Sequence, residues 1–255
     1  MSRPARVLSI AGSDSSGGAG IQADIKTITM MGGYAMTAIT AVTAQDSTGV
    51  HAAMVLDPAL VAAQIDACIA DIGVDAIKIG MLGSAAIAAL VADRIEQARV
   101  PVVFDPVMMA TSGAALADPA TIAAFDRLMT LATLVTPNVV ELAALGGAEA
   151  LAARGITFLA KGGDAPGEIV TDHLHMPGQP VQSWSAPRIA TRHSHGTGCT
   201  LSSAIACLLG QGLPLPTAIA RARAFVRAAL EAAPGFGQGS GPLGHHAVTA
   251  AQWRD

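Results

Sequence analysis

Short apolar runs recur along the chain, and each is followed, after Gly, Pro or Asp, by a longer alanine-rich segment. The runs cover residues 7–11, 76–79, 102–104, 134–136 and 157–160. Continuous apolar runs of this length are typical of parallel strands that are buried on both faces. The rhythm therefore predicts an α/β fold, with a doubly wound, mostly parallel central sheet flanked by helices on both faces.

Helix starts are predicted where an aspartate precedes a proline, because Asp caps the free N–H groups of a first turn and Pro fits its first position. Such pairs predict helices over residues 58–71 and 119–129, and two further helices are predicted over 198–210 and 215–232. The segment 168–189 interrupts the rhythm and predicts two antiparallel strands at an edge of the sheet.

Composition narrows the class of protein. The chain has 255 residues, 51% of them hydrophobic, and a net charge of −4. No repeat or linker is visible, so we expect one domain over residues 1–255. The negative charge offers no basic surface for a nucleic acid or an anionic membrane, and no apolar run reaches the roughly 18 residues that span a bilayer. Cys68, Cys199 and Cys207 lack metal-site or disulfide spacing, which favours reduced thiols and a cytoplasmic protein.

A glycine- and serine-rich segment, residues 11–20, follows the first predicted strand and precedes a helix that carries Asp24. Glycines there allow backbone N–H groups to face a ligand at the start of a helix. The spacing fits neither a Walker A loop nor the dinucleotide fingerprint. Taken by itself, the segment fits a plain strand-to-helix turn equally well.

A second glycine segment opens the first of the two C-terminal helices. Its N–H groups, on Gly196, Thr197, Gly198 and Cys199, are placed to bind the oxygens of a transferring phosphoryl group. A thiol at a helix start is expected to have a lowered pKa. The alternative is a small buried cysteine that packs behind a tight turn.

Charged and amide side chains follow three other predicted strands, at the edge where ligands of open α/β sheets bind. Asn138 and Glu141 are three residues apart at a helix start, and Asp105 and Lys161 each follow an apolar run directly. An amide and carboxylates suit Mg²⁺ that keeps several waters, and a lysine suits phosphates. Helix capping and a solvated loop lysine are the structural alternatives.

Seven motifs occur in order: AGSDSSGGAGIQADIKT, TAQDSTGV, IKIGML, DPVM, TPN followed by Glu141, KGG and HGTGCTLSSAIA. From about Leu8 to His245 the chain resembles the hydroxymethylpyrimidine/phosphomethylpyrimidine kinase family. The resemblance implies a ribokinase-like fold, use of ATP and Mg²⁺, and a homodimer. It also implies phosphorylation of 4-amino-5-hydroxymethyl-2-methylpyrimidine and then of its monophosphate, in thiamine biosynthesis.

The resemblance assigns roles to individual residues. For the substrate it implies a hydrogen bond from Gln45, a pocket lined by Gly12 and Ala19, Asp24 near the hydroxymethyl end, and apolar walls from Met81 and Val107. For the reaction it implies Cys199 as the base and an anion hole from Gly196 to Cys199. For the nucleotide it implies Lys161, Asn138 and Thr197 at the phosphates, with Glu141 and Asn138 serving Mg²⁺. Asp105 lies at the same rim, where it would contact the waters of the metal or cap its loop.

Three segments depart from the family pattern. Asp164 stands where a histidine is expected after KGG, residues 109–112 replace a VAKSG-like run and its lysine, and GPLGHH replaces a GPVNH-like tail. Because a lysine is missing before Ser112, weaker binding of the phosphorylated intermediate is expected, so the second phosphorylation is expected to be less efficient than the first. Three other functions remain open: a pyridoxal or pyridoxine kinase, a non-catalytic pyrimidine-binding protein and, least favoured, a Rossmann dehydrogenase.

Overall fold

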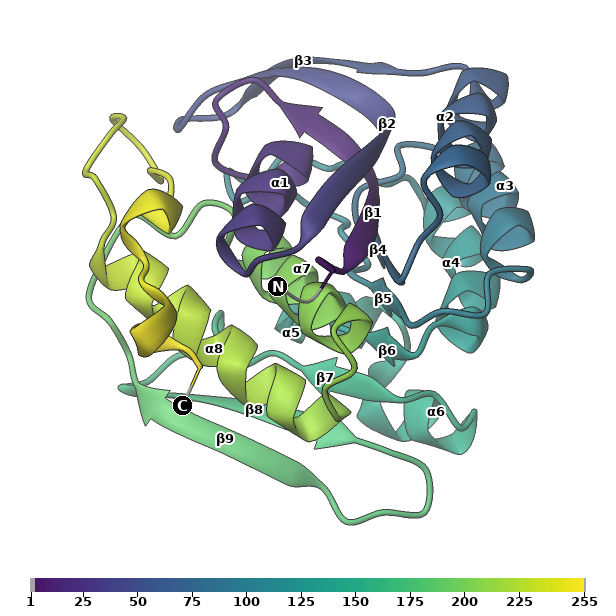
Figure 1. Cartoon of the computed structure of the whole chain (residues 1–255). Helices are drawn as coiled ribbons and strands as arrows, with labels where there is room; N and C mark the ends of the chain where they lie inside the picture. Colours follow the sequence, from purple (N-terminus) through teal and green to yellow (C-terminus); the bar gives the residue numbers. More distant parts are fainter. Residues whose placement is uncertain (1–2, 255) are drawn as a thin grey trace.

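The strands and helices of the computed structural model, which describes residues 3–254, alternate along the chain (Figure 1). The strands are β1 (Arg6–Asp14), β2 (Tyr34–Gln45), β3 (Val50–Val55), β4 (Ala76–Ile79), β5 (Val102–Phe104), β6 (Leu134–Val135), β7 (Phe158–Ala160), β8 (Ile169–His175) and β9 (Gln182–Pro187). The helices are α1 (Gly20–Met30), α2 (Pro58–Asp71), α3 (Ala85–Ile95), α4 (Pro119–Leu131), α5 (Val139–Ala144), α6 (Gly147–Ala153), α7 (Thr197–Gly210) and α8 (Leu215–Glu231), with short 3₁₀ turns at His245–Ala247 and Ala250–Gln252.

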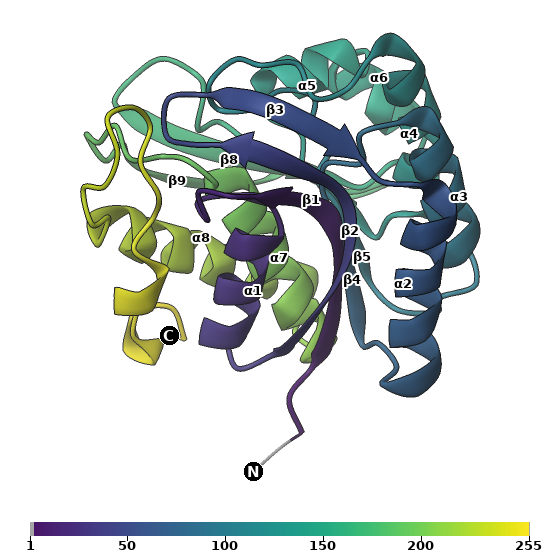
Figure 2. The same cartoon turned by 90° about the horizontal axis from the view of Figure 1, so that it is seen from above.

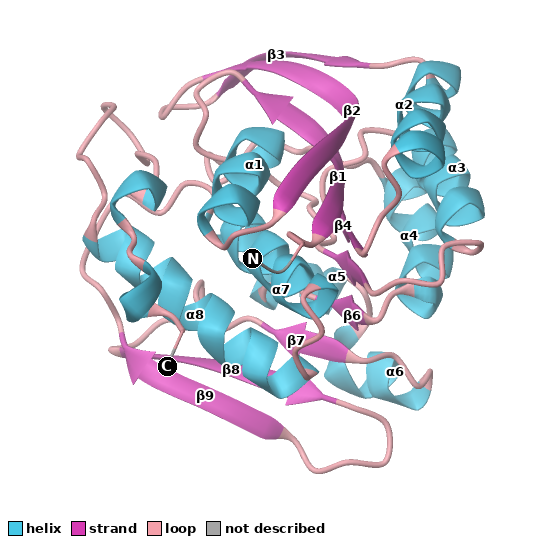
Figure 3. Cartoon of the chain, in the orientation of Figure 1, coloured by secondary structure: helices cyan, strands magenta, loops and turns pink. Residues whose placement is uncertain are grey.

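Within the described residues, all the strands join one sheet in the order β3-β2-β1-β4-β5-β6-β7-β8-β9. The central strands from β2 to β7 pair in parallel, and β3, β8 and β9 pair antiparallel at the two edges. The predicted fold class and the antiparallel excursion over 168–189 are thus confirmed (Figure 3). No helix in residues 3–254 is long and apolar enough to cross a membrane.

The pair β2 and β3 was not predicted. β2 alternates buried positions with half-buried or exposed ones along much of its length, and most of β3 is exposed. A search for continuous apolar runs overlooks such strands, because only fully buried strands give that pattern. Strand alternation is the signal that would have found β2.

Helices cover the sheet on both faces. Helices α1, α7 and α8 lie on one face, and α2, α3 and α4 lie on the other (Figure 2). Each face has its own apolar core. Strand residues contribute to both cores, which are completed mainly by α2 to α4 on one face and by α7 and α8 on the other. The capping prediction is also confirmed, because Asp57 accepts a hydrogen bond from the N–H of Ala59 and Asp118 accepts one from Thr121.

One buried histidine links folding to pH. His245 is 2% exposed, its Nε2 lies 2.8 Å from Thr200 Oγ1, and burial lowers its pKa from 6.5 to about 4. In the unfolded chain His245 is protonated below about pH 6.5, whereas in the folded chain it is protonated only below about pH 4. The contribution of His245 to the free energy of unfolding is therefore fully present above pH 6.5, and it is lost as the pH falls from 6.5 to about 4.

We expect the free energy of unfolding to fall by about 2 kcal/mol between pH 7 and pH 5 through His245 alone, at about 1.4 kcal/mol per pH unit. In urea titrations, His245→Gln should lack that part of the pH dependence. The exposed neighbour His246 provides the control, because His246→Asn should keep it. Equal pH dependence in the parent and His245→Gln would contradict the assignment.

Candidate functional site

A cavity of about 630 Å³ opens at the carboxyl ends of the central strands. The ends of β1 and β4 meet there, at the point where the chain switches from one side of the sheet to the other. Ligands of open α/β sheets bind at such a switch point. The cavity is lined by every predicted site residue except Asp24: Gly12, Ala19, Gln45, Met81, Asp105, Val107, Asn138, Glu141, Lys161, Gly196, Thr197, Gly198 and Cys199.

One end of the cavity holds a buried cluster of charges. The Nζ of Lys161 lies 2.8 Å from Asp105 Oδ1 and 3.9 Å from Glu141 Oε2. Thr136 donates a hydrogen bond of 3.0 Å to the same Asp105 oxygen. Because these side chains come from the ends of β5, β6 and β7, the parallel sheet itself brings them together.

The charges in this cluster shift one another's pKa values. Burial acts to lower the pKa of Lys161, but Asp105 and Glu141 outweigh it and raise the pKa. Burial raises the pKa of Glu141 to about 7, with Lys161 opposing and Asp105 adding to the rise. Lys161 therefore stays positively charged at pH 7. Glu141 is partly protonated at pH 7, and a bound cation would lower its pKa again.

Asn138 and Glu141 form a capping box at the start of α5. Glu141 N donates to Asn138 Oδ1 and Asn138 N donates to Glu141 Oε2, both at 2.8 Å. Among residues 3–254, no group of three or more His, Cys, Asp or Glu side chains could cage a metal ion. The buried Glu141 carboxylate suits a cation that stays mainly hydrated and phosphate-bound, as Mg²⁺ does. Asp105 is already paired with Lys161, so its predicted contact with the metal has a competing partner.

The start of α7 lies against the charge cluster. Gly196 has a φ of 88°, and a side chain there would overlap the carbonyl oxygen of Gly18. A Cβ on Gly198 would lie 3.2 Å from Lys161 Nζ and 3.5 Å from Asp105 Oδ2. The glycines thus allow the helix start to approach both the loop after β1 and the lysine, as an anion site requires.

The predicted lowering of the Cys199 pKa is wrong. Burial raises the pKa of this thiol to about 11, and Asp24 and Asp105 add to the rise although Lys78 opposes it. The helix-start argument considered only the local dipole, whereas enclosure and two nearby carboxylates act in the opposite direction. Cys199 is thus a neutral thiol at pH 7.

A neutral thiol is a weak base, so we expect Cys199→Ser to lower kcat by no more than about 10²-fold, the lower end of general-base contributions. Phosphoryl transfer depends mainly on positioning and charge stabilisation, which this substitution leaves in place. Steady-state kinetics at pH 7 would measure the effect. A loss beyond about 10⁴-fold would show that the thiol is the essential base.

Asp24, which was predicted to lie near the hydroxymethyl end of the substrate, is not part of the cavity wall. It is fully buried. Its carboxylate binds Lys78 Nζ at 2.9 and 3.0 Å, and Ser9 and Ser203 donate to it. Ser203 lies one turn after Cys199 on α7, so the pair packs against the first turns of that helix. Asp24 therefore supports the floor of the site.

The other end of the cavity is a smaller, mixed pocket. Gly12 lies against Met81, since a Cβ there would come within 2.9 Å of the sulfur. Met81 and Val107 are apolar lining residues, and the Gln45 carboxamide lies 3.3 Å from Thr43 Oγ1. This end fits a flat ring that carries a few polar groups.

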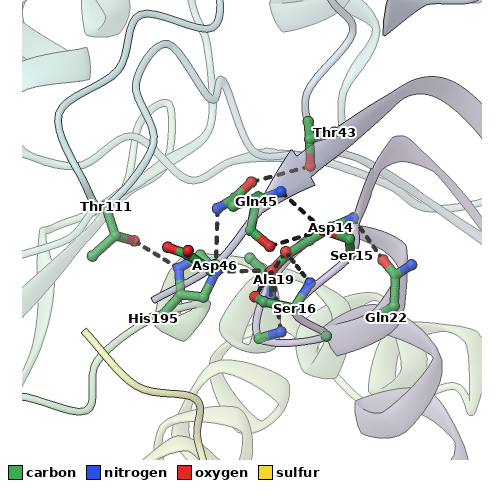
Figure 4. A network of polar contacts seen from close by, with 12 residues as sticks. Asp14, Ser15, Ser16, Ala19, Gln22, Thr43, Gln45, Asp46, Thr111 and His195 are labelled. Atoms are coloured by element: carbon green, nitrogen blue, oxygen red, sulfur yellow. Dashed lines mark hydrogen bonds and ion pairs between the residues drawn. The ribbon is translucent and has the colours of Figure 1, made fainter. Parts of the chain in front are cut away.

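Sequence reasoning missed two residues of this pocket. His195 Nε2 lies 2.8 Å from Asp14 Oδ2, and both side chains are nearly fully buried (Figure 4). Burial acts to raise the pKa of Asp14, but hydrogen bonds from His195, Ala19 and Ser16 outweigh it and lower the pKa. Both residues stand inside motifs that we had singled out for their glycines alone, so a search of those motifs for titratable side chains would have found them.

Most of the chain matches one known protein family. The model of the phosphomethylpyrimidine kinase family matches residues 14–244. The chain belongs to the phosphomethylpyrimidine kinase family. The predicted resemblance is thus confirmed, and a Rossmann dehydrogenase is no longer a candidate.

Individual relatives agree with this membership. A hydroxymethylpyrimidine/phosphomethylpyrimidine kinase of Rhizobium meliloti is 45% identical over 93% of this chain and 96% of its own. The pyridoxal kinase of Staphylococcus aureus, in complex with AMP-PCP and pyridoxal, superposes with a TM-score of 0.87 at 31% identity, over 96% of this chain and 95% of its own. The phosphomethylpyrimidine kinase of Clostridium difficile superposes with a TM-score of 0.74 at 34% identity, over 88% of this chain and 98% of its own.

A second set of charged side chains holds the loop that carries Lys161. Asp172 Oδ1 accepts a 2.8 Å hydrogen bond from Gly162 N, and its Oδ2 accepts one of 2.6 Å from Arg223. Arg188 donates to carbonyl oxygens of Gly163 and Gly167. These contacts fix the loop after β7 and hold the backbone that carries Lys161. Sequence reasoning missed them, because the partners are far apart in the chain.

Proposed function

We propose that the protein transfers the γ-phosphoryl group of ATP to the hydroxymethyl oxygen of 4-amino-5-hydroxymethyl-2-methylpyrimidine, and then phosphorylates the monophosphate. One observation carries this proposal: the first turn of α7 lies in a single cavity that also contains the Gln45 pocket and the Lys161 cluster. Transfer of a phosphoryl group from a nucleotide to a ring requires the acceptor pocket, the anion site and the phosphate-binding lysine to lie in one cavity. The names and sequences of the relatives support the same reaction and its place in thiamine biosynthesis.

At the acceptor end, Gln45 would pair with the aminopyrimidine edge, since a carboxamide both donates and accepts. Gly12 and Ala19 would allow the ring to lie close to the backbone, and Met81 and Val107 would pack against its faces. The hydroxymethyl group would then face the start of α7.

At the nucleotide end, Lys161 would bind the phosphates, and the N–H groups of Gly196 to Cys199 would stabilise the charge on the transferring group. Use of ATP is supported by the AMP-PCP complex of the staphylococcal relative. Mg²⁺ would be held by the phosphates and by Glu141, with Asn138 beside it, and would offset phosphate charge. In the transfer, the hydroxyl oxygen bonds to the γ-phosphorus and gives up its proton to a phosphoryl oxygen or to water. The bond from that phosphorus to the bridging oxygen breaks, and ADP leaves.

A second acceptor has a specific observation in its favour. The TM-score to the staphylococcal pyridoxal kinase, 0.87, exceeds the 0.74 to the clostridial phosphomethylpyrimidine kinase. Pyridoxal also carries a hydroxymethyl arm on a flat heteroaromatic ring. The fold thus accommodates both, and the polar groups of the pocket decide between them.

An ADP-release assay with MgATP tests the proposal, with the hydroxymethylpyrimidine, its monophosphate or pyridoxal as the acceptor and products identified by mass. We expect turnover of both pyrimidines. Turnover of pyridoxal alone would move the assignment to a pyridoxal kinase. Tight pyrimidine binding without ADP release would indicate a binding protein. The homodimer and the cytoplasmic location stay predictions, which sedimentation and fractionation would check.

A further inference from the structure

The acceptor pocket contains a hydrogen-bonded network whose donors and acceptors must be consistent. His195 Nε2 lies 2.8 Å from Asp14 Oδ2 and 3.3 Å from the Gln45 Nε2 position (Figure 4). The Gln45 Oε1 position lies 3.3 Å from Thr43 Oγ1. The carboxamide of Gln45 therefore lies between an imidazole and a hydroxyl group, and each of these favours one of its two orientations.

The proton on His195 is fixed by its partner. Asp14 accepts hydrogen bonds from the N–H groups of Ser16, Gly18 and Ala19, and its pKa is lowered despite burial. An ionised carboxylate only accepts, so His195 Nε2 carries the hydrogen that it donates to Asp14. This nitrogen then has no lone pair with which to accept, so toward Gln45 it can only share the N–H that it donates to Asp14.

The hydroxyl proton of Thr43 is also committed. Thr43 Oγ1 donates to the carbonyl oxygen of Ser13 at 2.9 Å. A hydroxyl group has one proton, so toward Gln45 it can only accept. An amide nitrogen beside His195 and an amide oxygen beside Thr43 would then give a donor–donor and an acceptor–acceptor contact. Rotation of the carboxamide by half a turn gives Thr43 an N–H donor and brings an oxygen to the His195 N–H, which Asp14 and Gln45 can then share, without any change in shape.

We propose that the Asp14–His195 pair fixes the Gln45 carboxamide with its oxygen toward His195 and its nitrogen toward Thr43, and thereby selects aminopyrimidines over pyridoxal. His195 is in this sense a positioning residue, which acts on the substrate through Gln45. The inference rests on the proposed function and adds to it the origin of its specificity.

The chemistry of the two acceptors explains the selection. Beside its hydroxymethyl arm, the aminopyrimidine presents an amine that donates and then a ring nitrogen that accepts. The fixed carboxamide offers an acceptor on the His195 side and a donor on the Thr43 side, which matches this pair. At the equivalent positions pyridoxal has an aldehyde oxygen and a phenol oxygen. The aldehyde oxygen would face the carboxamide oxygen, and two acceptors repel each other.

A pair of substitutions isolates the donated hydrogen bond. The side-chain nitrogen of a glutamine reaches about as far as Nε2 of histidine, whereas that of an asparagine reaches only as far as Nδ1. His195→Gln therefore keeps the donor that faces Asp14 and Gln45, and His195→Asn removes it. Asp14 is less suitable for substitution, because it also holds the backbone of the loop after β1.

We expect His195→Asn to lower kcat/KM for the hydroxymethylpyrimidine by about 10- to 100-fold, mainly through KM, because a buried polar pair is mismatched. For pyridoxal, kcat/KM should change by less than about threefold, because the fixed orientation of the Gln45 carboxamide does not favour pyridoxal binding. His195→Gln should keep the parent's preference. Equal losses on both acceptors in His195→Asn would show a merely structural role and overturn the inference.

Calorimetric titration with the hydroxymethylpyrimidine in the absence of ATP separates this inference from the proposed function. Affinity that falls in His195→Asn and is kept in His195→Gln supports the positioning role, whereas equal affinity in the parent and His195→Asn overturns it. Failure of the proposed function would appear in the parent instead, as pyrimidine binding without turnover of either pyrimidine.

Discussion

Substitution of Lys161 by methionine is expected to lower kcat by about 10²- to 10³-fold, the effect of removing a preorganised group that stabilises transition-state charge. Lys161 is the cation that faces both the start of α7 and the buried carboxylates of Asp105 and Glu141. Without it, those carboxylates would repel the phosphates that the site must bind. Steady-state ADP release at saturating pyrimidine would measure the loss.

Two further variants show whether the charge itself is responsible. Lys26 is exposed and donates only to the carbonyl oxygen of Gly17, so Lys26→Met removes a lysine without touching the cluster. We expect it to keep kcat within about threefold. Lys161→Arg keeps the charge but not the shape, and should retain more of the rate than Lys161→Met. A Lys161→Met protein that turns over as fast as the Lys26→Met control would disprove the role of Lys161.

Local patterns were sufficient for much of the fold. The strand over 76–79 and the helix over 58–71 were predicted with the bounds that the structure has, because each depends on a short apolar run or a capping pair. The capping of α5 by Asn138 and Glu141 is likewise a relation between residues three apart. The alternative reading of this pair as a helix cap is therefore correct, and its role toward Mg²⁺ stays a prediction.

Relations between distant segments could not be obtained this way. Asp14 and His195 are separated by 181 positions, and Lys78 and Asp24 by 54. Nothing in the local sequence around Cys199 indicates that the fold removes its thiol from water and brings the carboxylates of Asp24 and Asp105 near it, so its pKa was predicted in the wrong direction. The family resemblance identified residues that meet in the cavity, but it did not show that Asp24 lies beneath the cavity and pairs with Lys78.

The pair of Lys78 and Asp24 is also where we expect the largest effect on stability. Both side chains are fully buried, with Lys78 Nζ 2.9 Å from Asp24 Oδ2. Burial acts to lower the pKa of Lys78, but Asp24, with Cys199 and Asp105 adding to it, outweighs burial and raises the pKa, so Lys78 is a buried cation. Removal of one partner leaves a buried charge without compensation, which typically costs about 3–5 kcal/mol.

Lys78→Met should therefore lower the free energy of unfolding by about 3–5 kcal/mol in urea titrations, whereas Lys26→Met should change it by no more than about 0.5 kcal/mol. Addition of Asp24→Asn to Lys78→Met removes the orphaned charge. Ser9 and Ser203 donate to different oxygens of Asp24, so the amide can accept from one of them and donate to the hydroxyl oxygen of the other. The double variant should recover at least half of the loss, because replacing both members of a buried pair costs far less than breaking it. If the double variant were less stable than Lys78→Met by the full cost of a second independent substitution, the uncompensated charge would not be the cause. The two residues would then contribute through packing alone.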